Sequence, residues 1–359
     1  MQKIQLSVYT LLFLVLSIGI LFIAREFLVP LALSAILAML FIPICRWLEM
    51  RGMHRAVAAV ISVLVLLGAV GLIVFLLSWQ LSGFTENMDK MKAQGLALFQ
   101  QLKDWVDAQL GISPQQQEKM IEEQGKSAGG EGGNMLAGFI SGTFGVMVNT
   151  VLVIVYLFLF LYFRSRIKNF ILKLVPKDEE GNAQKVIHQS AQVSQKYLGG
   201  LASMIVVLWI LYGIGFSLVG VENAIFFAIL CGVLEIVPFV GNLTGTSITA
   251  FATLAQGGGG EKVLWVLLVY MVVQFIQTYI LEPLVVGDQV NINPLFTIMV
   301  LVAGELIWGI AGMVMAIPLL GIVKIVCDNV PGLEPYGYLI GTDKKKKTRY
   351  VSRFRKPAR

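Results

Sequence analysis

Charged residues are scarce in this chain of 359 residues. Only 14% of the residues are Asp, Glu, Lys or Arg, whereas 57% are hydrophobic, and the mean hydropathy is +0.77. A soluble domain carries nearer a quarter charged residues. Many apolar runs exceed about 18 residues, the length that marks a membrane-spanning helix. The shortage of charge therefore excludes an ordinary soluble domain and predicts an all-α polytopic membrane protein.

Cysteine and histidine are also scarce, with three and two residues. The cysteines lie far apart, in or beside apolar runs, which excludes a disulfide framework and a zinc-ligand spacing. One stretch, Gly125-Lys126-Ser127, has the end of a phosphate-binding loop, but Met120 stands where that loop requires glycine. We therefore predict no catalytic site, no metal, no cofactor and no ATP-hydrolysing domain, so the protein is not expected to be an enzyme.

The net charge of +6 comes from basic residues clustered at the edges of the apolar runs. Segments 45–55, 164–198 and 344–359 carry most of the Lys and Arg, and the positive-inside bias assigns all three to the cytoplasm. The basic tail is expected to contact anionic headgroups of the lipid bilayer. This distribution gives no indication of nucleic-acid binding, and it predicts that both termini are cytoplasmic.

The apolar runs predict about eight transmembrane helices, since about 20 residues cross the hydrocarbon core. Their approximate bounds are 6–24, 27–44, 56–78, 136–163, 199–220, 222–255, 262–283 and 294–327. With both ends inside, the short loops near Val219 and Gly287 lie outside. Segments 222–255 and 294–327 are too long for straight spans, so each is a long tilted helix, a broken helix or a helical hairpin.

These runs divide the chain into six parts. We expect transmembrane helices one to three in 1–78, an extracytoplasmic loop with an amphipathic helix at Leu96–Leu110 in 79–134, the fourth helix in 135–163, a cytoplasmic amphipathic segment in 164–198, a C-terminal transport region in 199–327 and a basic cytoplasmic tail in 328–359.

Two long apolar segments of the C-terminal half are interrupted near their middle. The first contains EIVPFVGN, from Glu235 to Asn242, and the second contains Glu305, Gly309, Gly312 and Pro318. Irregular backbone is tolerated at membrane depth only where protein or a water-filled cavity covers it. A carboxylate there is expensive unless it has a partner or a function. Paired broken segments point to the binding site of a secondary transporter, so we predict a solute or ion pathway here.

The same motifs, taken in order, resemble a known family, the autoinducer-2 exporter (AI-2E) family. They are Glu235-x-x-Pro238-x-x-Gly241, Glu282-Pro283-x-x-x-Gly287, Asn293-Pro294-Leu295, Gly304-x-x-x-x-Gly309-x-x-Gly312 and Ile317-Pro318. The resemblance implies a multi-pass transporter of the bacterial inner (cytoplasmic) membrane without ATPase domains. Members have been linked to export of the quorum-sensing signal autoinducer-2, and others to sodium/proton exchange. Glu305 departs from the expected pattern, because a neutral residue is expected there.

Glu235 is the central candidate, since a carboxylate flanked by Val233, Leu234, Ile236 and Val237 can carry a proton. The alternative is that it caps backbone amides freed by the break. Gln274 and Gln277 lie on one side of the seventh predicted helix, 262–283, where they either line a pathway or make interhelical hydrogen bonds. The predicted pathway residues are Glu235, Pro238, Gly241, Asn242, Thr244, Gln274, Gln277, Glu282, Pro283 and Glu305. The predicted hinge residues are Gly287, Pro294, Gly309, Gly312 and Pro318.

Three functions remain open from the sequence. The leading one is gradient-driven export of a small polar solute such as autoinducer-2. The second is sodium (cation)/proton antiport, which needs an intramembrane carboxylate that binds proton and cation competitively. The third is a membrane scaffold or regulatory protein. The expected partners are a small polar solute or ions (proton, sodium), the bilayer, and further copies of the chain in a homo-oligomer.

Overall fold

The computed structural model describes residues 2–85, 132–238, 240–286 and 291–342, and in these ranges every long element is a helix. The N-terminal half consists of α1 (Gln2–Ile23), α2 (Arg25–Met50), α3 (Arg55–Thr85) and α6 (Gly132–Lys173). The predicted outer amphipathic helix at 96–110, Gly287 and the basic tail from residue 343 lie outside the described residues.

The C-terminal half is more finely divided. It consists of α7 (Glu180–Val219), α8 (Ala224–Leu234), α9 (Val240–Ala255), α10 (Gly259–Ile276), the π-helix η1 (Gln277–Val286), α11 (Pro294–Asn329) and α12 (Glu334–Ile340). Within the described ranges, six helices are long and apolar enough to cross a membrane, and shorter apolar helices are found at Leu11–Ile23 and Ala224–Leu234. The predicted all-α polytopic fold is confirmed.

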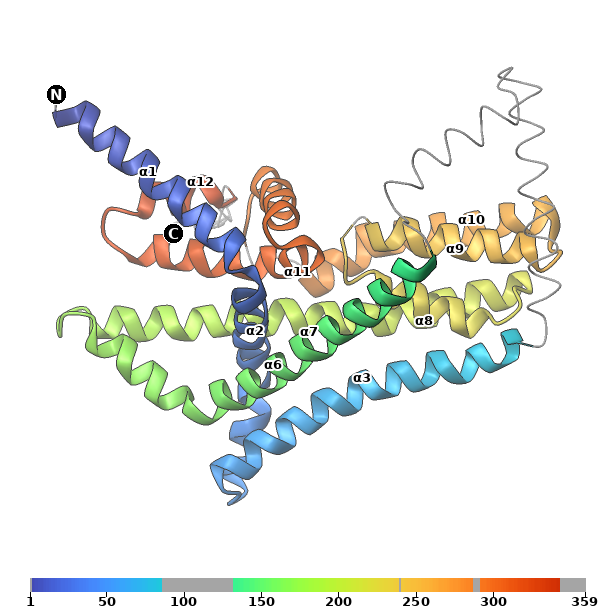
Figure 1. Ribbon diagram of the computed structural model, residues 1–359, viewed down its shortest axis with the longest axis horizontal. Coiled ribbons are helices and arrows are strands. Elements are labelled where there is room, and N and C mark those ends of the chain that lie inside the picture. The colour runs from blue at the N-terminus through green and yellow to red at the C-terminus, as the bar shows by residue number, and fades with distance from the viewer. Residues whose placement is uncertain (1, 86–131, 239, 287–290, 343–359) are drawn as a thin grey trace, which may run out of the picture.

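The molecule has two distinct ends along its long axis (Figure 1). The start of α1, the connection between α6 and α7, and α12 lie at one end, drawn on the left. The ends of α3 and α7 and the start of α10 lie at the other. We call the first the basic end, because segment 164–198 supplies its Lys and Arg, and the second the far end.

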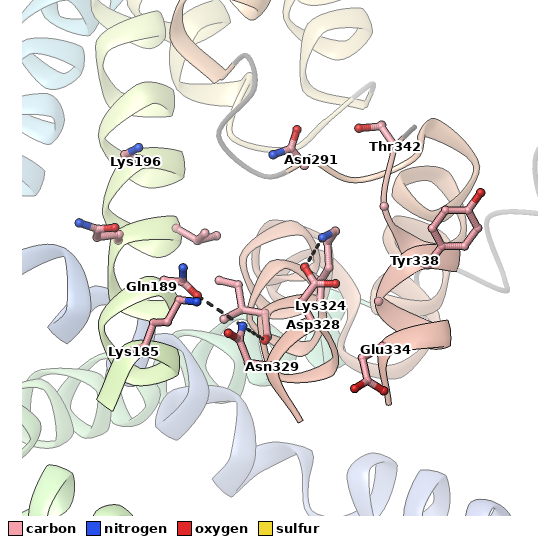
Figure 2. A pocket seen from close by; sticks show the side chains of 15 residues that line it. Lys185, Gln189, Lys196, Asn291, Lys324, Asp328, Asn329, Glu334, Tyr338 and Thr342 are labelled. Carbon is pink, nitrogen blue, oxygen red and sulfur yellow. Dashed lines mark hydrogen bonds and ion pairs between the residues drawn. The ribbon is translucent and has the colours of Figure 1, made fainter. Parts of the chain in front are cut away.

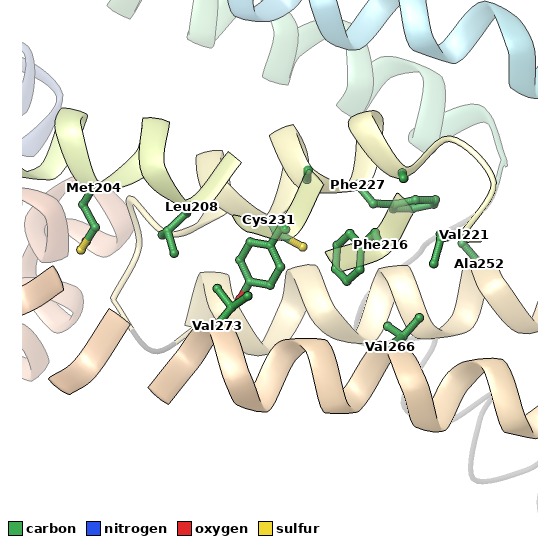
Figure 3. Packing of buried hydrophobic residues seen from close by; sticks show 12 residues of the cluster. Met204, Leu208, Phe216, Val221, Phe227, Cys231, Ala252, Val266 and Val273 are labelled. Carbon is green, nitrogen blue, oxygen red and sulfur yellow. The ribbon is translucent and has the colours of Figure 1, made fainter. Parts of the chain in front are cut away.

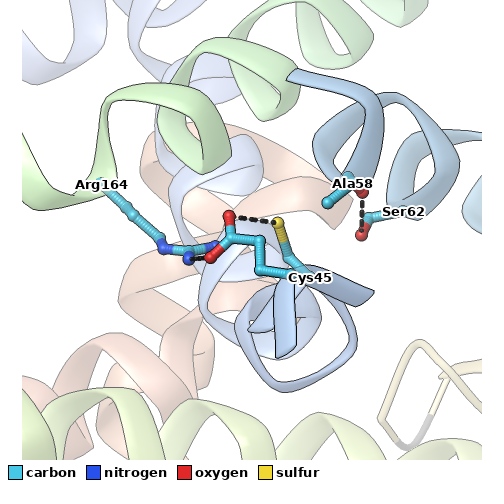
Figure 4. Close-up of polar contacts among 5 residues, drawn as sticks. Cys45, Ala58, Ser62 and Arg164 are labelled. Atoms are coloured by element: carbon cyan, nitrogen blue, oxygen red, sulfur yellow. Dashed lines mark hydrogen bonds and ion pairs between the residues drawn. The ribbon is translucent and has the colours of Figure 1, made fainter. Parts of the chain in front are cut away.

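Near the basic end, α2 packs against α3 and α6 through a buried apolar cluster that includes Cys45, Leu48, Ala58, Leu157 and Leu161. An ion pair between Glu49 of α2 and Arg164 of α6 closes this cluster. The Cys45 thiol donates to Glu49 Oε1 over 3.8 Å, and Ser62 Oγ donates to the Ala58 carbonyl over 2.8 Å (Figure 4). A charge pair thus joins two helices that are far apart in the sequence.

Two predicted boundaries are wrong in the same way. The second half of the expected cytoplasmic segment at 164–198 and the expected span at 199–220 form one helix, α7, of 40 residues, about 60 Å long. Likewise, α6 continues beyond residue 163 to Lys173. Gly199 and Gly200 do not interrupt α7, since a glycine inside a helix costs only about 1 kcal/mol. Ser194 and Tyr197 before these glycines, and Met204 after them, are buried against neighbouring helices.

Segment 222–255 is a helical hairpin made of α8 and α9 (Figure 3). The two helices are antiparallel: Gly245 packs on Cys231, and Thr249 Oγ1 lies 3.6 Å from Cys231 Sγ. Val221, before α8, and Ala252, near the end of α9, lie together at one end of a long buried cluster. The chain therefore leaves this hairpin at the end of the molecule where it entered.

Segment 294–327 is also a hairpin, within α11. Its turn is at Gly309, where φ is 60° and ψ is −144°. A methyl group built at Gly304 would lie 2.7 Å from the carbonyl oxygen of Gly312, so the two limbs are in close contact beside the turn.

The start of α11 lies beside the end of α12, which follows α11 in the chain. The amide of Asn293 donates to the Ile340 carbonyl over 2.8 Å, and the amide of Thr342 donates to the Asn291 carbonyl over 3.2 Å. The loop after the seventh predicted helix (262–283) was predicted to lie outside and segment 328–359 in the cytoplasm, and these two predictions cannot both be right, because residues 291–293 contact residues 340–342.

Candidate functional site

The break between α8 and α9 is a tight turn. Pro238 has no backbone N–H to continue a helix. The Val240 amide donates to the Pro238 carbonyl over 2.7 Å, and the Gly241 amide donates to the Val237 carbonyl over 3.0 Å. Gly241 lies directly against the backbone oxygen of Leu234, where any side chain would overlap that atom. The turn places Glu235 at the inner end of α8.

Glu235 is buried and has a specific partner. Gln277 Nε2, at the first position of η1, donates to Glu235 Oε1 over 2.6 Å. The two residues are 8% and 2% exposed, respectively. A buried carboxylate needs such a hydrogen bond to be tolerated. A π-helix is rare and is found most often at functional sites. The position of Gln277 at the start of η1 therefore supports a functional role for its hydrogen bond to Glu235.

A second hydrogen bond runs beside the first. Asn242 Nδ2, in the first turn of α9, donates to Gln274 Oε1 in α10, and Gln274 Nε2 donates to Thr278 Oγ1 over 3.3 Å. Two side-chain contacts therefore join the α8–α9 hairpin to α10 and η1. We call this site the polar junction; it comprises Glu235, Asn242, Thr246, Gln274 and Gln277.

Three oxygen atoms of the polar junction are buried without a hydrogen-bond partner in the described part of the chain: Asn242 Oδ1, Thr246 Oγ1 and Gln277 Oε1. A buried polar atom left unpaired costs about 1–3 kcal/mol. Native structures retain few such atoms, and each calls for an explanation. One of them belongs to Gln277, the partner of Glu235, and the other two lie on one face of α9, so a ligand with donors, or a cation, would satisfy them.

The other predicted residues are distributed as follows. Thr244 is on α9 and Glu282 is on η1, and both are exposed. Glu305 is exposed on α11, and none of the hydrogen bonds found in the described ranges joins it to the polar junction. Gly287 lies outside the described residues, as does the side chain of Pro283. Glu305 was thus grouped with Glu235 on hydropathy alone, and the fold places it on a different hairpin.

The predicted hinge residues of α11 have structural roles. Pro294 is at the first position of the helix, and the preceding Asn293 caps it by accepting from the Leu295 amide over 3.0 Å. Gly309 makes the turn and Gly312 packs on Gly304. Pro318 is buried inside the second limb. These residues shape a hairpin, and no contact described here links them to Glu235.

Sequence reasoning did not single out Thr246 from the polar residues of α9. Thr246 is 3% exposed and carries one of the unpaired oxygens. Its spacing of four residues from Asn242 places both on one face of α9. That spacing was the available signal, but the sequence does not show which face of α9 packs against α10, so it could not separate Thr246 from Thr244.

A bundle of apolar helices with two hairpins and a buried carboxylate at a helical break defines a polytopic α-helical membrane protein with a polar site inside it. The particular family follows from comparison with known proteins. Residues 11–332 match the profile of the AI-2E family transporter, so the chain belongs to that family.

Relatives of the chain carry compatible names. It is 24% identical over 315 residues to YrrI of Bacillus subtilis, named as a candidate transport protein, with 85% of this chain and 86% of YrrI covered. It is 26% identical over 337 residues to PerM of Escherichia coli, named as a candidate permease, with 90% and 93% covered. The predicted family membership is confirmed, and the names support a membrane transporter or permease.

Proposed function

We propose that this protein is a gradient-driven transporter of the bacterial inner membrane that exports a small polar solute such as autoinducer-2 through the polar junction. The supporting observation is the set of unpaired buried oxygens beside Glu235. A solute rich in hydroxyl groups would donate hydrogen bonds to these acceptors and would satisfy groups that are otherwise costly to bury.

The polar junction is closed in this conformation, because Glu235, Gln277 and Asn242 are all buried. A solute reaches it only when the α8–α9 hairpin separates from α10 and η1. Two side-chain hydrogen bonds join these elements, from Gln277 to Glu235 and from Asn242 to Gln274. Binding of a proton at Glu235 changes the first of them and so biases the two positions of the hairpin. This gives gated passage or alternating access around a buried carboxylate.

A second candidate, cation/proton antiport, is favoured by the chemical type of the unpaired atoms. All three are oxygens, and oxygen is the ligand that hard metal cations prefer. With the Glu235 carboxylate they form a group of acceptors to which a partly dehydrated sodium ion would bind. A proton and a cation would then compete for the same carboxylate, which is the requirement for exchange.

Flux through proteoliposomes tests both candidates. The purified chain is reconstituted, and sodium, proton and small polar solutes including autoinducer-2 are followed under imposed gradients. Solute efflux that stops with Glu235→Gln supports export, whereas sodium-driven proton movement without solute flux supports antiport. Glu222→Gln is the matched control, because Glu222 is an exposed acid in the loop before α8. If none of the gradients moves any of these species through the unaltered chain, transport is refuted and the scaffold hypothesis gains weight.

A further inference from the structure

A cavity of about 700 Å³ opens at the basic end of the molecule (Figure 2). Its walls come from the first half of α7, the end of α11, and α12, with Asn291 and Thr342 at its upper edge in this view. None of its lining residues belongs to the polar junction. The volume lies within the usual range for small-molecule sites, about 300–1,000 Å³.

One face of α7 lines the cavity along three helical turns. Lys185, Gln189, Gln192 and Lys196 are separated by four, three and four residues, which places them on one side of the helix. Lys185 and Lys196 stand at the two ends of this stripe, about 16 Å apart along the helix axis. The cavity wall therefore carries positive charge at both ends, with amide groups between.

The two carboxylates of the cavity are already engaged. Asp328 forms an ion pair with Lys324, and Glu334 Oε2 accepts from the Gly332 amide over 2.8 Å. Lys185 and Lys196 have no ion-pair partner among the residues that the structure describes. Three lysines and two carboxylates line the cavity, so its formal net charge is +1, and the two lysines without an ion-pair partner both lie on the α7 wall.

We propose that this cavity binds an elongated anion of about nucleotide size that carries phosphate groups at both ends or a chain of phosphates. Lysine is a common phosphate ligand because it supplies a compact charge with three donors. Two separated lysines suit two separated anionic groups better than a single small anion. The shared chemistry has two sources, a soluble phosphorylated metabolite or the headgroup of an anionic phospholipid.

The position of the cavity gives such binding a structural consequence. Asn291 precedes α11, and Lys324 and Asp328 lie near its end, while the lysine stripe belongs to α7. A bound anion would hold the base of the α11 hairpin to α7 and would stabilise the packing of these elements.

The test uses the full-length chain in nanodiscs of zwitterionic lipid, titrated calorimetrically with pyrophosphate and, separately, with ADP. A second arm replaces part of the lipid with cardiolipin, whose headgroup carries two phosphates, and follows the thermal unfolding temperature. We expect saturable binding that Lys185→Gln and Lys196→Gln each weaken about tenfold, as expected for loss of one charged hydrogen bond. Lys177→Gln is the matched control, because Lys177 is exposed at the same end and does not line the cavity.

The outcomes separate the two sources. Binding of pyrophosphate or ADP that depends on both cavity lysines supports a soluble ligand, and a rise in unfolding temperature with cardiolipin that depends on them supports a headgroup. The proposal is overturned if neither arm responds, or if Lys177→Gln weakens binding as much as the cavity substitutions. Because no flux is measured, failure here is distinct from failure of the proposed transport.

Discussion

Gln277 and Glu235 are 42 residues apart in the chain and are joined by one buried hydrogen bond of 2.6 Å. The donor is the first residue of a π-helix and the acceptor ends the first helix of a hairpin. Movement of the hairpin away from η1 must break this bond, and a change in the charge of Glu235 must alter it. The contact therefore couples the state of one carboxylate to the position of a whole structural element.

Glu235→Gln should insert normally but lose transport, or lose the pH dependence of transport. The amide keeps an oxygen that can accept from Gln277, so the fold is retained, but it cannot exchange a proton or carry a negative charge. Other titratable groups near Glu235 are Tyr212 on α7, Cys231 on α8, Tyr270 on α10 and Glu282 on η1. The measurement is flux into proteoliposomes from pH 5 to 9, with Glu222→Gln as control.

Glu282→Gln should be milder, because that side chain is exposed. If Glu235→Gln transports like the parent across the pH range while Glu282→Gln is inactive, the pathway follows η1 past Glu282 and does not depend on Glu235.

Gly241→Ala should destabilise the protein, because the added methyl group overlaps the backbone oxygen of Leu234. Overpacking costs about 1–3 kcal/mol and more when backbone must move, so the unfolding temperature should fall by about 1–4 °C or more. Gly213→Ala is the control, since its methyl group would sit 3.8 Å from Ala228 in ordinary contact. Equal stability of the two variants would show that the turn at Pro238 is looser than described.

Cysteines at positions 291 and 342 should form an intramolecular disulfide. The Thr342 amide donates to the Asn291 carbonyl, which brings the two α-carbons within the range that a disulfide spans. Asn291→Cys with Thr342→Cys, in a chain lacking Cys45, Cys231 and Cys327, should cross-link on mild oxidation and shift on a non-reducing gel. The pair 222 and 291 is the control and should stay unlinked; the opposite pattern would show that α11 crosses the membrane once.

The charge distribution predicts that position 127 faces outside and position 348 faces the cytoplasm. Single cysteines at Ser127 and Thr348, in the same cysteine-free chain, should therefore differ in labelling by an impermeant thiol reagent added to sealed cells. Only the first should react, and both should react once the cells are opened. Labelling of Thr348→Cys in sealed cells would reverse the assigned orientation.

Glu49→Gln should destabilise the chain more than the double change Glu49→Gln with Arg164→Met. The single change leaves Arg164, whose side chain is only 14% exposed, without its counter-charge. Breaking a fully buried pair costs about 3–5 kcal/mol, and partial exposure reduces this to about 2 kcal/mol. The unfolding temperatures of the single and double variants measure the difference. If the double change is the more damaging, the pair itself stabilises the contact of α2 with α6.

The helix break at Pro238 could be predicted from the sequence, because proline and glycine constrain the local backbone. Glu235 and Gln277 were each singled out, since an acid and an amide inside apolar runs are expensive. The contact between Glu235 and Gln277 could not be predicted, because a single sequence contains no information on contacts between positions so far apart. The same limit explains why Glu305 was grouped with them, although it lies exposed on α11.

The hairpin form of the two long segments was left open for a different reason. A hairpin and a long tilted helix have the same hydropathy, so composition does not separate them. Only tertiary contacts decide between the two forms. Gly304 contacts Gly312 beside the turn of α11, and Cys231 contacts Gly245 between α8 and α9. The π-helix likewise had no sequence signal, since Gln277–Val286 reads as the continuation of α10.

The shortness of the α8–α9 hairpin has a consequence for the biogenesis of the protein. α8 has 11 residues and α9 has 16, about 17 Å and 24 Å, so neither reaches across a hydrocarbon core of about 30 Å. The hairpin's buried face is completed by Val266 and Val273 of α10, which emerge from the ribosome later. The hairpin must therefore take its final place after α10 has been inserted, and a nascent chain that ends near Gly258 would expose its apolar and polar faces together to lipid or to a chaperone.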